Sequence, residues 1–284
     1  MKNDLLSQIL LKVESLPSMP KAGARVLALL KAPDTSVAEI EKVLRHDPGL
    51  TTNVLKLANS AYFGMPSKVG SVKQAFILLG AKRLSQLVLT TCTCALMDKA
   101  VEGYESPPGE LWRHSIAVAT IAEALVKYKK ITESMDVYTP ALLHDIGKLV
   151  LGRYVKEEFE TIRNIVVTGV TQDIAENMVL GIDHAELGSQ ILSQWSFPQD
   201  VINAVRFHHN ADAIHNSSNQ IDIVYLANLL FHSSTNSRTH KGQPVGLTPA
   251  LINRLNIKPE QFEKITEKVE PWINKISKEL QRLS

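Results

Sequence analysis

The chain has 284 residues, of which 44% are hydrophobic and 21% charged, so disorder and fibrous repeats are excluded and a sizeable core is expected. Lys and Arg number 31 against 29 Asp and Glu, and the formal net charge is +2. This balance lacks the basic excess that is typical of nucleic-acid-binding domains.

Two cysteines, Cys92 and Cys94, lie two positions apart in an apolar helical run, so their side chains do not face each other. We expect free thiols in a reducing cytoplasm. The N-terminus shows no signal-peptide core, and no run is judged long enough to cross a bilayer. The sequence therefore predicts a cytoplasmic protein without membrane association.

The N-terminal part contains apolar stripes at helical spacing, separated by turn and cap residues. Ser36 with Glu39 has the pattern of a capping box, and Asp47 before Pro48 marks another helix start. Gly80 has the character of a glycine that ends a helix. The helices expected here span residues 6–16, 21–31, 36–44, 47–58, 71–80 and 81–98, with a loop at 60–66.

A stretch rich in glycine and proline at residues 103–109 is the best internal boundary. It divides the chain into an N-terminal helical lobe, residues 1–107, and a second lobe, residues 108–284. No segment alternates with period 2, so the fold class is all-α, a multi-helix bundle. The helices expected in the second lobe span residues 111–129, 139–151, 155–168, 171–180, 185–195, 199–209 and 221–231 and resume at 248, with loops at 216–220 and 233–246 and a kink at Pro271.

The segment 139–151 is the most informative, with Thr139 as a candidate N-cap and Pro140 at the first helical position. At about 100° per residue, His144 and Lys148 point away from the apolar stripe and Asp145 lies on its flank. Either these residues form a solvent-facing polar edge, or His144 and Asp145 are a metal-ligand pair aimed into a second interior surface. The stripe consists of Leu142, Leu143, Ile146, Leu149 and Val150.

Other histidines lie in similarly ambiguous places. His114 is in an apolar helix with Glu110 one turn before it, on the same face, but a core histidine bonded to a carbonyl would look alike. His184 follows a helix-capping aspartate, where the macrodipole disfavours the cation and keeps the imidazole neutral. An exposed first-turn position would explain it equally well.

His208 and His209 end a helix, where a cation is favourable without any metal. The remaining histidines are expected at the surface: His46, His215, His232 and His240. Taken together, several imidazoles and one or two carboxylates on separate helices fit iron or manganese, with zinc as a further candidate, and not calcium or a thiolate site. Such a site could activate water and clamp a phosphoryl oxygen, with Lys148 holding phosphate.

Several motifs resemble the HD superfamily of metal-dependent phosphohydrolases and, within it, the HDOD family, over residues 10–232. The HD-type motifs are Trp112-Arg113-His114-Ser115, Leu143-His144-Asp145-Ile146-Gly147-Lys148, Asp183-His184-Ala185-Glu186-Leu187-Gly188 and Phe207-His208-His209. The HDOD-type motifs are Leu16-Pro17-Ser18-Met19-Pro20, His46-Asp47-Pro48-Gly49-Leu50, Leu57-Ala58-Asn59-Ser60-Ala61-Tyr62-Phe63 and Gln74-Ala75-Phe76-Ile77-Leu78-Leu79-Gly80. The resemblance implies an HD/HDOD-type helical bundle.

The resemblance also implies a set of site residues. Lys148 matches the lysine near the bridging water and phosphate, and with Asp145 it is the catalytic candidate; Glu110 matches a carboxylate found in some relatives. The family's last ligand is an aspartate, but this chain has Asn228, a neutral and weaker ligand. The positions that match metal ligands of active relatives are His114, His144, Asp145, His184, His208 and His209.

The glycine-tyrosine-proline signature of the HD-GYP phosphodiesterases is absent after His209, so cyclic di-GMP hydrolysis is not expected. The resemblance implies a bacterial regulatory protein of signal transduction, with a signalling protein or a nucleotide as partner. A metal-dependent phosphohydrolase is the second hypothesis. A nucleic-acid-binding regulator is the third. Residues 36–59 faintly resemble a helix-turn-helix, but the second helix of this segment carries just Lys56 as a basic residue.

Overall fold

The computed structural model describes residues 6–10, 19–32, 35–60, 63, 68–129, 135–210, 219–235, 248–256, 261, 264, 265, 267, 268 and 271. Within these ranges every regular element is a helix, and the only β-type pairing is an isolated bridge between Val101 and Ser106. The predicted all-α class is therefore confirmed. The chain forms two compact units, one of Pro17–Asp98 with Lys278–Ser284 and one of Met1–Leu16 with Lys99–Ser277.

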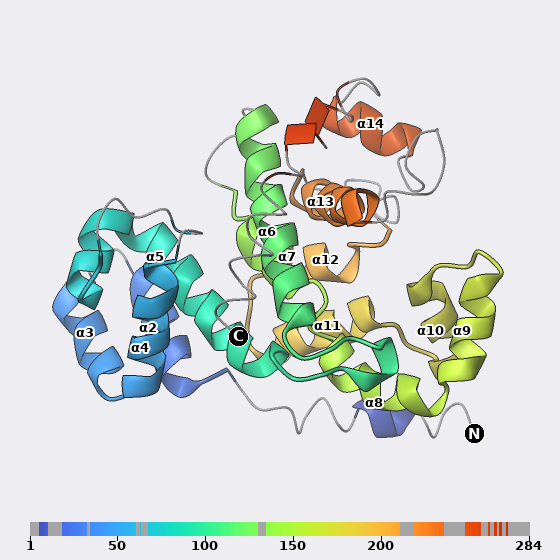
Figure 1. Cartoon of the computed structure of the whole chain (residues 1–284), viewed down its shortest axis with the longest axis horizontal. Helices are drawn as coiled ribbons and strands as arrows, with labels where there is room; N and C mark the ends of the chain where they lie inside the picture. Colours follow the sequence, from blue (N-terminus) through green and yellow to red (C-terminus); the bar gives the residue numbers. More distant parts are fainter. Residues whose placement is uncertain are drawn as a thin grey trace. The chain divides into compact units, whose positions relative to one another are not determined.

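The unit that contains Pro17–Asp98 is built around α5, which packs against the three helices before it (Figure 1). Ser36 forms the predicted capping box with Glu39, and the Asp47 side chain accepts a hydrogen bond from the backbone N–H of Leu50. These caps satisfy amide groups that have no partner within their own helix. The helices are α2 (Lys21–Lys31), α3 (Val37–Arg45), α4 (Pro48–Ala58) and α5 (Val72–Met97).

Helix α5 is kinked at Gly80, which has a φ of 73° and so takes a conformation that glycine adopts without strain. The predicted helix end at Gly80 is thus a kink between two helical stretches. By length and composition alone α5 could cross a membrane, contrary to the expectation that no run is long enough, and half of its apolar window is buried inside the protein. Its packing against α2, α3 and α4 is that of a core helix.

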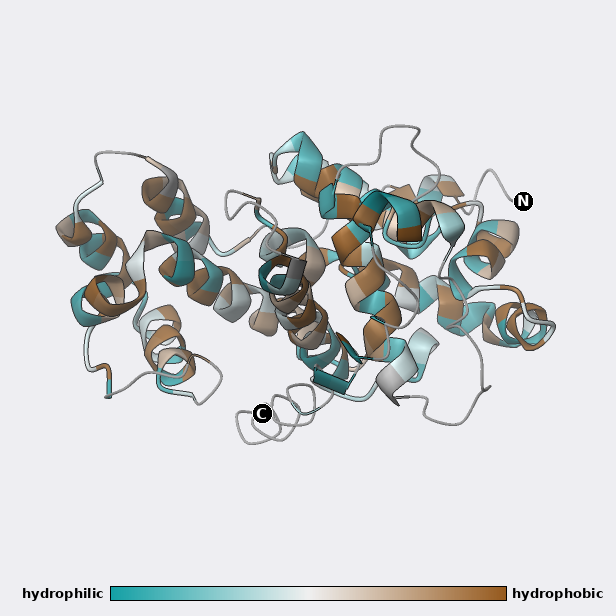
Figure 2. Ribbon diagram, turned by 90° about the horizontal axis from the view of Figure 1, so that it is seen from above, coloured by the Kyte–Doolittle hydropathy of each residue, from teal (hydrophilic) through white to brown (hydrophobic). Residues whose placement is uncertain are grey.

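The unit that contains Lys99–Ser277 begins with a 3₁₀ helix, η1 (Glu102–Tyr104), and the long helix α6 (Glu110–Lys129). As the all-round apolar sequence predicts, α6 is central: it packs against α7 and α13, and Ile116 and Ala119 are among its fully buried side chains. Hydropathy colouring shows hydrophobic and hydrophilic residues in separate bands along most helices (Figure 2). The remaining helices are α7 (Tyr138–Leu143), α8 (Lys148–Glu157), α9 (Phe159–Val167), α10 (Gln172–Leu180), α11 (His184–Gln194), α12 (Gln199–Arg206), α13 (Asn219–Thr235) and α14 (Pro249–Leu255).

The compact units do not coincide with the predicted lobes of residues 1–107 and 108–284. The division falls at Asp98, before the Gly/Pro stretch, because η1 packs on α8. A Cβ at Gly103 would overlap the backbone oxygen of Gly152, so this close approach requires glycine. Residues 6–10 also belong to this unit, and Ile9 is fully buried there.

The segment predicted as one helix over residues 139–151 is two helices with a break. Helix α7 ends at Leu143, α8 starts at Lys148, and Val137 rather than Thr139 is the N-cap of α7. The break consists of tight turns, since the amide N–H groups of Ile146, Lys148 and Leu149 bond the carbonyls three residues before them. Both His144 and Asp145 are buried, at 0% and 1% exposure, so the prediction of a second interior surface holds and the solvent-facing alternative is wrong.

Other helix limits differ by short stretches. The predicted helix 155–168 is divided between α8 and α9, α12 stops at Arg206, and α13 already begins at Asn219 and runs to Thr235. The residues on both sides of Pro271, and with them the predicted kink, lie outside the described residues. The part of the first helix beyond residue 10 and most of the C-terminal stripe lie outside them as well.

Candidate metal centre

Asp145 is the hub of a buried histidine cluster in the break between α7 and α8. Its Oδ2 lies 3.4 Å from the Nε2 atoms of both His114 and His144. Its Oδ1 lies 3.3 Å from His184 Nε2 and 3.7 Å from His208 Nε2. Imidazole Nε2 atoms thus face both oxygens of one carboxylate.

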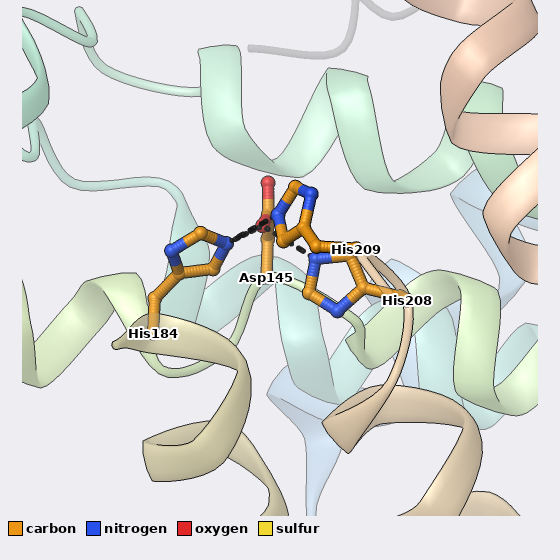
Figure 3. A group of neighbouring side chains, drawn as sticks. All are labelled: Asp145, His184, His208 and His209. Carbon is orange, nitrogen blue, oxygen red and sulfur yellow. Dashed lines mark hydrogen bonds and ion pairs between the residues drawn. The ribbon is translucent and has the colours of Figure 1, made fainter. Parts of the chain in front are cut away.

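Two groups of candidate ligand atoms result, each with all members within 4.8 Å of one another. Figure 3 shows the larger group, in which His184 and His208 direct their rings toward Asp145 from two sides. The contributing segments are far apart in the sequence: α6, the α7–α8 break, the start of α11 and the turn after α12. The larger group is Asp145, His184, His208 and His209; the smaller is His114, His144 and Asp145.

Two of the rings are fixed by hydrogen bonds to backbone carbonyls. His144 Nδ1 lies 2.7 Å from the oxygen of Ala141, and His208 Nδ1 lies 2.6 Å from the oxygen of Val205. A carbonyl can only accept, so both Nδ1 atoms carry a proton and each ring turns its Nε2 toward Asp145. This arrangement of an imidazole with its second nitrogen anchored is typical of metal ligands.

His184 is fixed differently, by a carboxylate. Glu176 on α10 is fully buried, and its Oε2 accepts hydrogen bonds from both Nδ1 of His184, at 2.7 Å, and the His184 backbone N–H, at 2.9 Å. Burial alone would lower the pKa of His184, but the Glu176 charge overrides it and raises the pKa to about 9. Burial would likewise raise the pKa of Glu176, and the contact with His184 lowers it instead. Glu176 is therefore an ionised partner that increases the basicity of His184.

Burial keeps three other rings of the cluster neutral. Burial lowers the pKa of His114 to about 3 and holds the pKa values of His208 and His209 well below the usual range. Burial would raise the pKa of Asp145, but His144 and the Lys148 ammonium hold it well below its usual range. Neutral imidazoles beside an ionised carboxylate are the protonation states that metal binding requires, whereas His184, with its raised pKa, would have to release a proton when a metal binds.

Two atoms at the centre of the cluster have unsatisfied hydrogen-bonding capacity. Asp145 Oδ1 and His208 Nε2 are buried and have no hydrogen-bond partner within the part of the chain that the structure describes. Unsatisfied buried polar atoms are rare and costly, so they indicate that a further group belongs between them. The donor set of imidazoles and one carboxylate fits iron, manganese or zinc.

Close backbone contacts fix the position of the cluster. A Cβ at Gly147 would overlap the backbone oxygen of His184 and lie 2.8 Å from the backbone nitrogen of Gly188. The break that carries Asp145 therefore lies in direct backbone contact with the helix that begins at His184. Glycine at this position lets the two segments approach closely enough for Asp145 and His184 to meet.

Lys148 and Tyr104 form one side of the centre. The Lys148 ammonium donates to Asp145 Oδ2 at 2.7 Å, is 20% exposed, and lies 5.4 Å from the ring centroid of Tyr104. The Tyr104 ring also meets the His184 ring edge-on, at 6.3 Å. Burial and the charge of Glu176 hold the pKa of Tyr104 well above its usual range, so the phenol stays protonated.

Helix α13 forms another side, next to His114. The rings of Phe231 and His232 lie 4.6 Å and 5.3 Å from the His114 ring. His232 is exposed, as expected, but the expectation of an uninvolved surface residue missed this contact. Asn228, one turn earlier, is buried with an Oδ1 that has no hydrogen-bond partner among the described residues. An acceptor of this kind is consistent with the predicted weak ligand position.

Glu110 is the predicted site residue that the structure leaves apart. It begins α6 four residues before His114, but it is exposed and belongs to neither group of candidate ligands. The first turn of α6 does not bring its side chain inward. The metal roles of the clustered residues and the catalytic roles of Asp145 and Lys148 stay predictions.

Two residues of the site escaped the sequence analysis. Glu176 lies in an ordinary amphipathic helix, and only the fold brings it onto His184, eight residues later. Tyr104 lies in the Gly/Pro-rich stretch that was treated as a boundary. No short-range pattern marks either residue, because both act through a tertiary contact.

The fold and the cluster define a class: all-helical proteins with a buried His/Asp centre of the HD type. The family model of the HDOD domain matches residues 16–211, more than half of the chain. The chain therefore belongs to the HDOD domain family.

Three proteins illustrate what this chain is similar to. An uncharacterised protein of Treponema pallidum (strain Nichols) is 24% identical over 208 residues; these are 72% of this chain and 40% of the relative, so the match spans less than half of that protein. An HDOD domain protein of unknown function from Geobacter sulfurreducens is 22% identical, with a TM-score of 0.77 and coverage of 99% of this chain and 97% of the other. A protein from Shewanella amazonensis SB2B, named provisionally as a phosphohydrolase, is 24% identical, with a TM-score of 0.74 and coverage of 97% and 98%. These similarities show the fold.

Proposed function

We propose that this chain is a regulatory HDOD protein of bacterial signal transduction, located in the cytoplasm, whose helical core binds divalent iron or manganese, with zinc as a further candidate. It acts by binding a signalling protein or a nucleotide. The observation that carries the metal proposal is the pair of unsatisfied buried atoms, Asp145 Oδ1 and His208 Nε2, among imidazoles whose second nitrogens are anchored. A protein from Marinobacter aquaeolei VT8, named provisionally as a signal transduction protein, has the same fold, with a TM-score of 0.75.

The regulatory assignment is supported by what the site lacks. Asn228 stands where an active relative would have a carboxylate, and the exposed Glu110 does not replace that charge. A neutral amide binds a cation less strongly than a carboxylate does. These departures favour a centre that senses or stabilises over one that turns over substrate.

The test compares wild-type protein with His144→Ala. Elemental analysis of the protein purified without added metal should find stoichiometric iron, manganese or zinc in the wild type and less in the variant. Ligand-dependent shifts of the unfolding temperature with a panel of nucleotides and cyclic dinucleotides, together with binding to candidate signalling proteins, should differ between the two. Absence of metal contradicts the metal site; identical binding by both proteins contradicts a metal-gated mechanism.

A metal-dependent phosphohydrolase is the second candidate, favoured by the position of Lys148. Its ammonium bonds Asp145 Oδ2 and is partly exposed, so it could also hold a phosphate oxygen at the edge of the centre. A bound divalent ion would lower the pKa of a water molecule and stabilise charge on the phosphoryl group. Asp145 would help to hold the ion, and Tyr104 lies beside Lys148, with its ring centroid 5.4 Å from the ammonium.

Turnover of a phosphoesterase panel with added manganese or iron tests this second candidate. We expect activity to disappear in Asp145→Ala and to fall in Lys148→Met. No turnover by metal-replete protein over the whole panel would reject it. The rejection would leave the regulatory proposal standing.

A further inference from the structure

The first stretch of α5 exposes two neighbouring large apolar side chains. Ile77 is 67% exposed and Leu78 46%, whereas Val72 and Ala75 of the same stretch are buried. Both belong to the HDOD-type motif of residues 74–80, which the candidate metal centre does not include. Contact of large apolar side chains with water costs free energy, and neighbouring ones on a single element are typical of interaction surfaces.

This stretch of α5 is a short helix of its own. The Ser71 side chain caps it by accepting a hydrogen bond from the Gln74 backbone N–H, and the kink at Gly80 separates it from the buried part of α5. Residues 72–79 therefore present their outer face in a fixed conformation. A partner that binds a preformed helix face does not pay for ordering it.

Lysines flank the apolar pair. Lys73 is exposed and precedes Ile77 by one helical turn, so the two side chains share a face. Gln74 precedes Leu78 by one turn, and its side-chain amide donates to the backbone oxygen of Lys68 at 3.3 Å. The exposed Lys68 thus lies beside the same face.

The charge of the surrounding unit has the same sign. Residues 17–98 contain ten Lys and Arg against five Asp and Glu, a net charge of +5, whereas the rest of the chain contains 21 against 24, a net charge of −3. Three of the five carboxylates bond backbone amides near helix starts. Glu39 is held in a capping box, Asp47 caps α4, and Glu41 accepts from the Lys73 backbone N–H at 3.3 Å. An acidic binding partner is therefore complementary to this unit.

We propose that the α5 surface, defined by Lys68, Lys73, Ile77 and Leu78, docks an acidic amphipathic helix of a signalling protein. Its apolar stripe covers the apolar pair, and its carboxylates face the lysines. A nucleic acid fits less well, because its phosphates offer the two apolar side chains no partner. An anionic membrane surface would require a wider apolar face.

This inference rests on the regulatory part of the proposed function and specifies the partner. None of the residues of the α5 surface belongs to the groups of candidate metal ligands. We therefore expect docking by metal-free and metal-loaded protein alike. Failure of docking and failure of metal binding are separate results, since elemental analysis tests the second without any partner.

The first experiment titrates the full chain into two labelled helical peptides of about 18 residues, which have the same leucine stripe on an alanine background. One carries glutamate on its polar face and the other lysine, and fluorescence anisotropy reports binding. The glutamate peptide should bind at least about tenfold more tightly, and its affinity should fall as the salt concentration rises. Equal affinities, or no binding of the glutamate peptide, overturn the inference and leave the metal site intact.

The second experiment locates the binding with matched variants. The double variant Ile77→Ser, Leu78→Ser should bind the glutamate peptide at least about fivefold more weakly, and Lys73→Ala should reduce the salt dependence. The controls are Val167→Ser on α9, 78% exposed, and Arg153→Ala on α8, also exposed; both should bind like the wild type. Unchanged affinity in the double variant, or equal weakening in the controls, overturns the inference. All four positions are exposed, and thermal unfolding curves check that the variants are folded.

The third experiment offers the other polyanions in the same buffer. The probes are a duplex DNA of about 20 base pairs and vesicles that contain phosphatidylglycerol. Both should bind more weakly than the glutamate peptide. Stronger binding of either one, lost in the double variant, assigns the α5 surface to that ligand and overturns the inference.

Discussion

Replacing Glu176 with glutamine should weaken metal binding about 10- to 100-fold, which is about 1.4 to 2.7 kcal/mol of binding free energy. The side chain is fully buried, and its Oε2 accepts from the His184 backbone N–H and from Nδ1 of the ring. Its Oε1 accepts from the Gln172 side-chain amide at 3.2 Å. Glutamine can keep its oxygen toward His184 and turn its NH₂ toward Gln172, whose own amide can flip to accept.

The substitution thus removes the charge while the hydrogen bonds persist. The Glu176 charge raises the pKa of His184 to about 9 against the effect of burial, and the same charge would continue to attract a divalent ion after the ring has released its proton to bind it. We expect the affinity to fall without a comparable loss of folding stability. Competition titration against a chromophoric chelator measures the first quantity, and urea unfolding of the metal-free protein measures the second.

Cobalt-loaded protein adds a spectroscopic measurement, because the visible ligand-field bands should shift when one ligand becomes less basic. Glu157→Gln is the matched control, since Glu157 is exposed on α8 and should leave both affinity and spectrum unchanged. If Glu176→Gln binds metal with wild-type affinity and gives the wild-type spectrum, the carboxylate does not tune His184 and the argument fails.

Three further outcomes follow from particular contacts. Gly147→Ala should cost at least about 2 kcal/mol of unfolding free energy and reduce metal content, because the new Cβ would overlap backbone atoms. The control variant Gly70→Ala, whose Cβ would have its nearest contact at 3.9 Å, should unfold like the wild type. Equal stability of the two variants in urea would refute this prediction. Arg254→Met should lower the free energy of unfolding by about 3 kcal/mol, because the fully buried Asp222 loses the two 2.9 Å hydrogen bonds that the Arg254 guanidinium donates. A change below about 0.5 kcal/mol in chemical unfolding would contradict this account of the pair. Burial raises the pKa of Cys92 to about 12, so its thiol should react with a disulfide reagent at pH 8 only after denaturation, and rapid labelling of that residue in the native protein would show the assignment wrong.

Most of the helical architecture follows from local sequence. Capping patterns at Ser36 and Asp47 place helix starts where the structure has them, because caps satisfy amides within three residues and need no distant partner. The apolar circumference of the helix beginning at Glu110 likewise predicts its burial. The break between Leu143 and Lys148 was not foreseen, since the apolar stripe continues through it and the turn is shaped by contact with the start of α11.

The candidate site likewise combines features that follow from the sequence with features that depend on the fold. The sequence by itself determined the composition of the cluster: which histidines, which aspartate and which lysine stand in motifs of the HD type, and that an asparagine replaces the last carboxylate. Only the tertiary structure decided which of them meet, because convergence depends on how separate helices pack and not on spacing within one helix. It brought Glu176 onto His184, left Glu110 at the surface and directed Lys148 to one oxygen of Asp145. The contacts of the two oxygens of Asp145 are a property of the folded chain, since no short segment contains all of their partners.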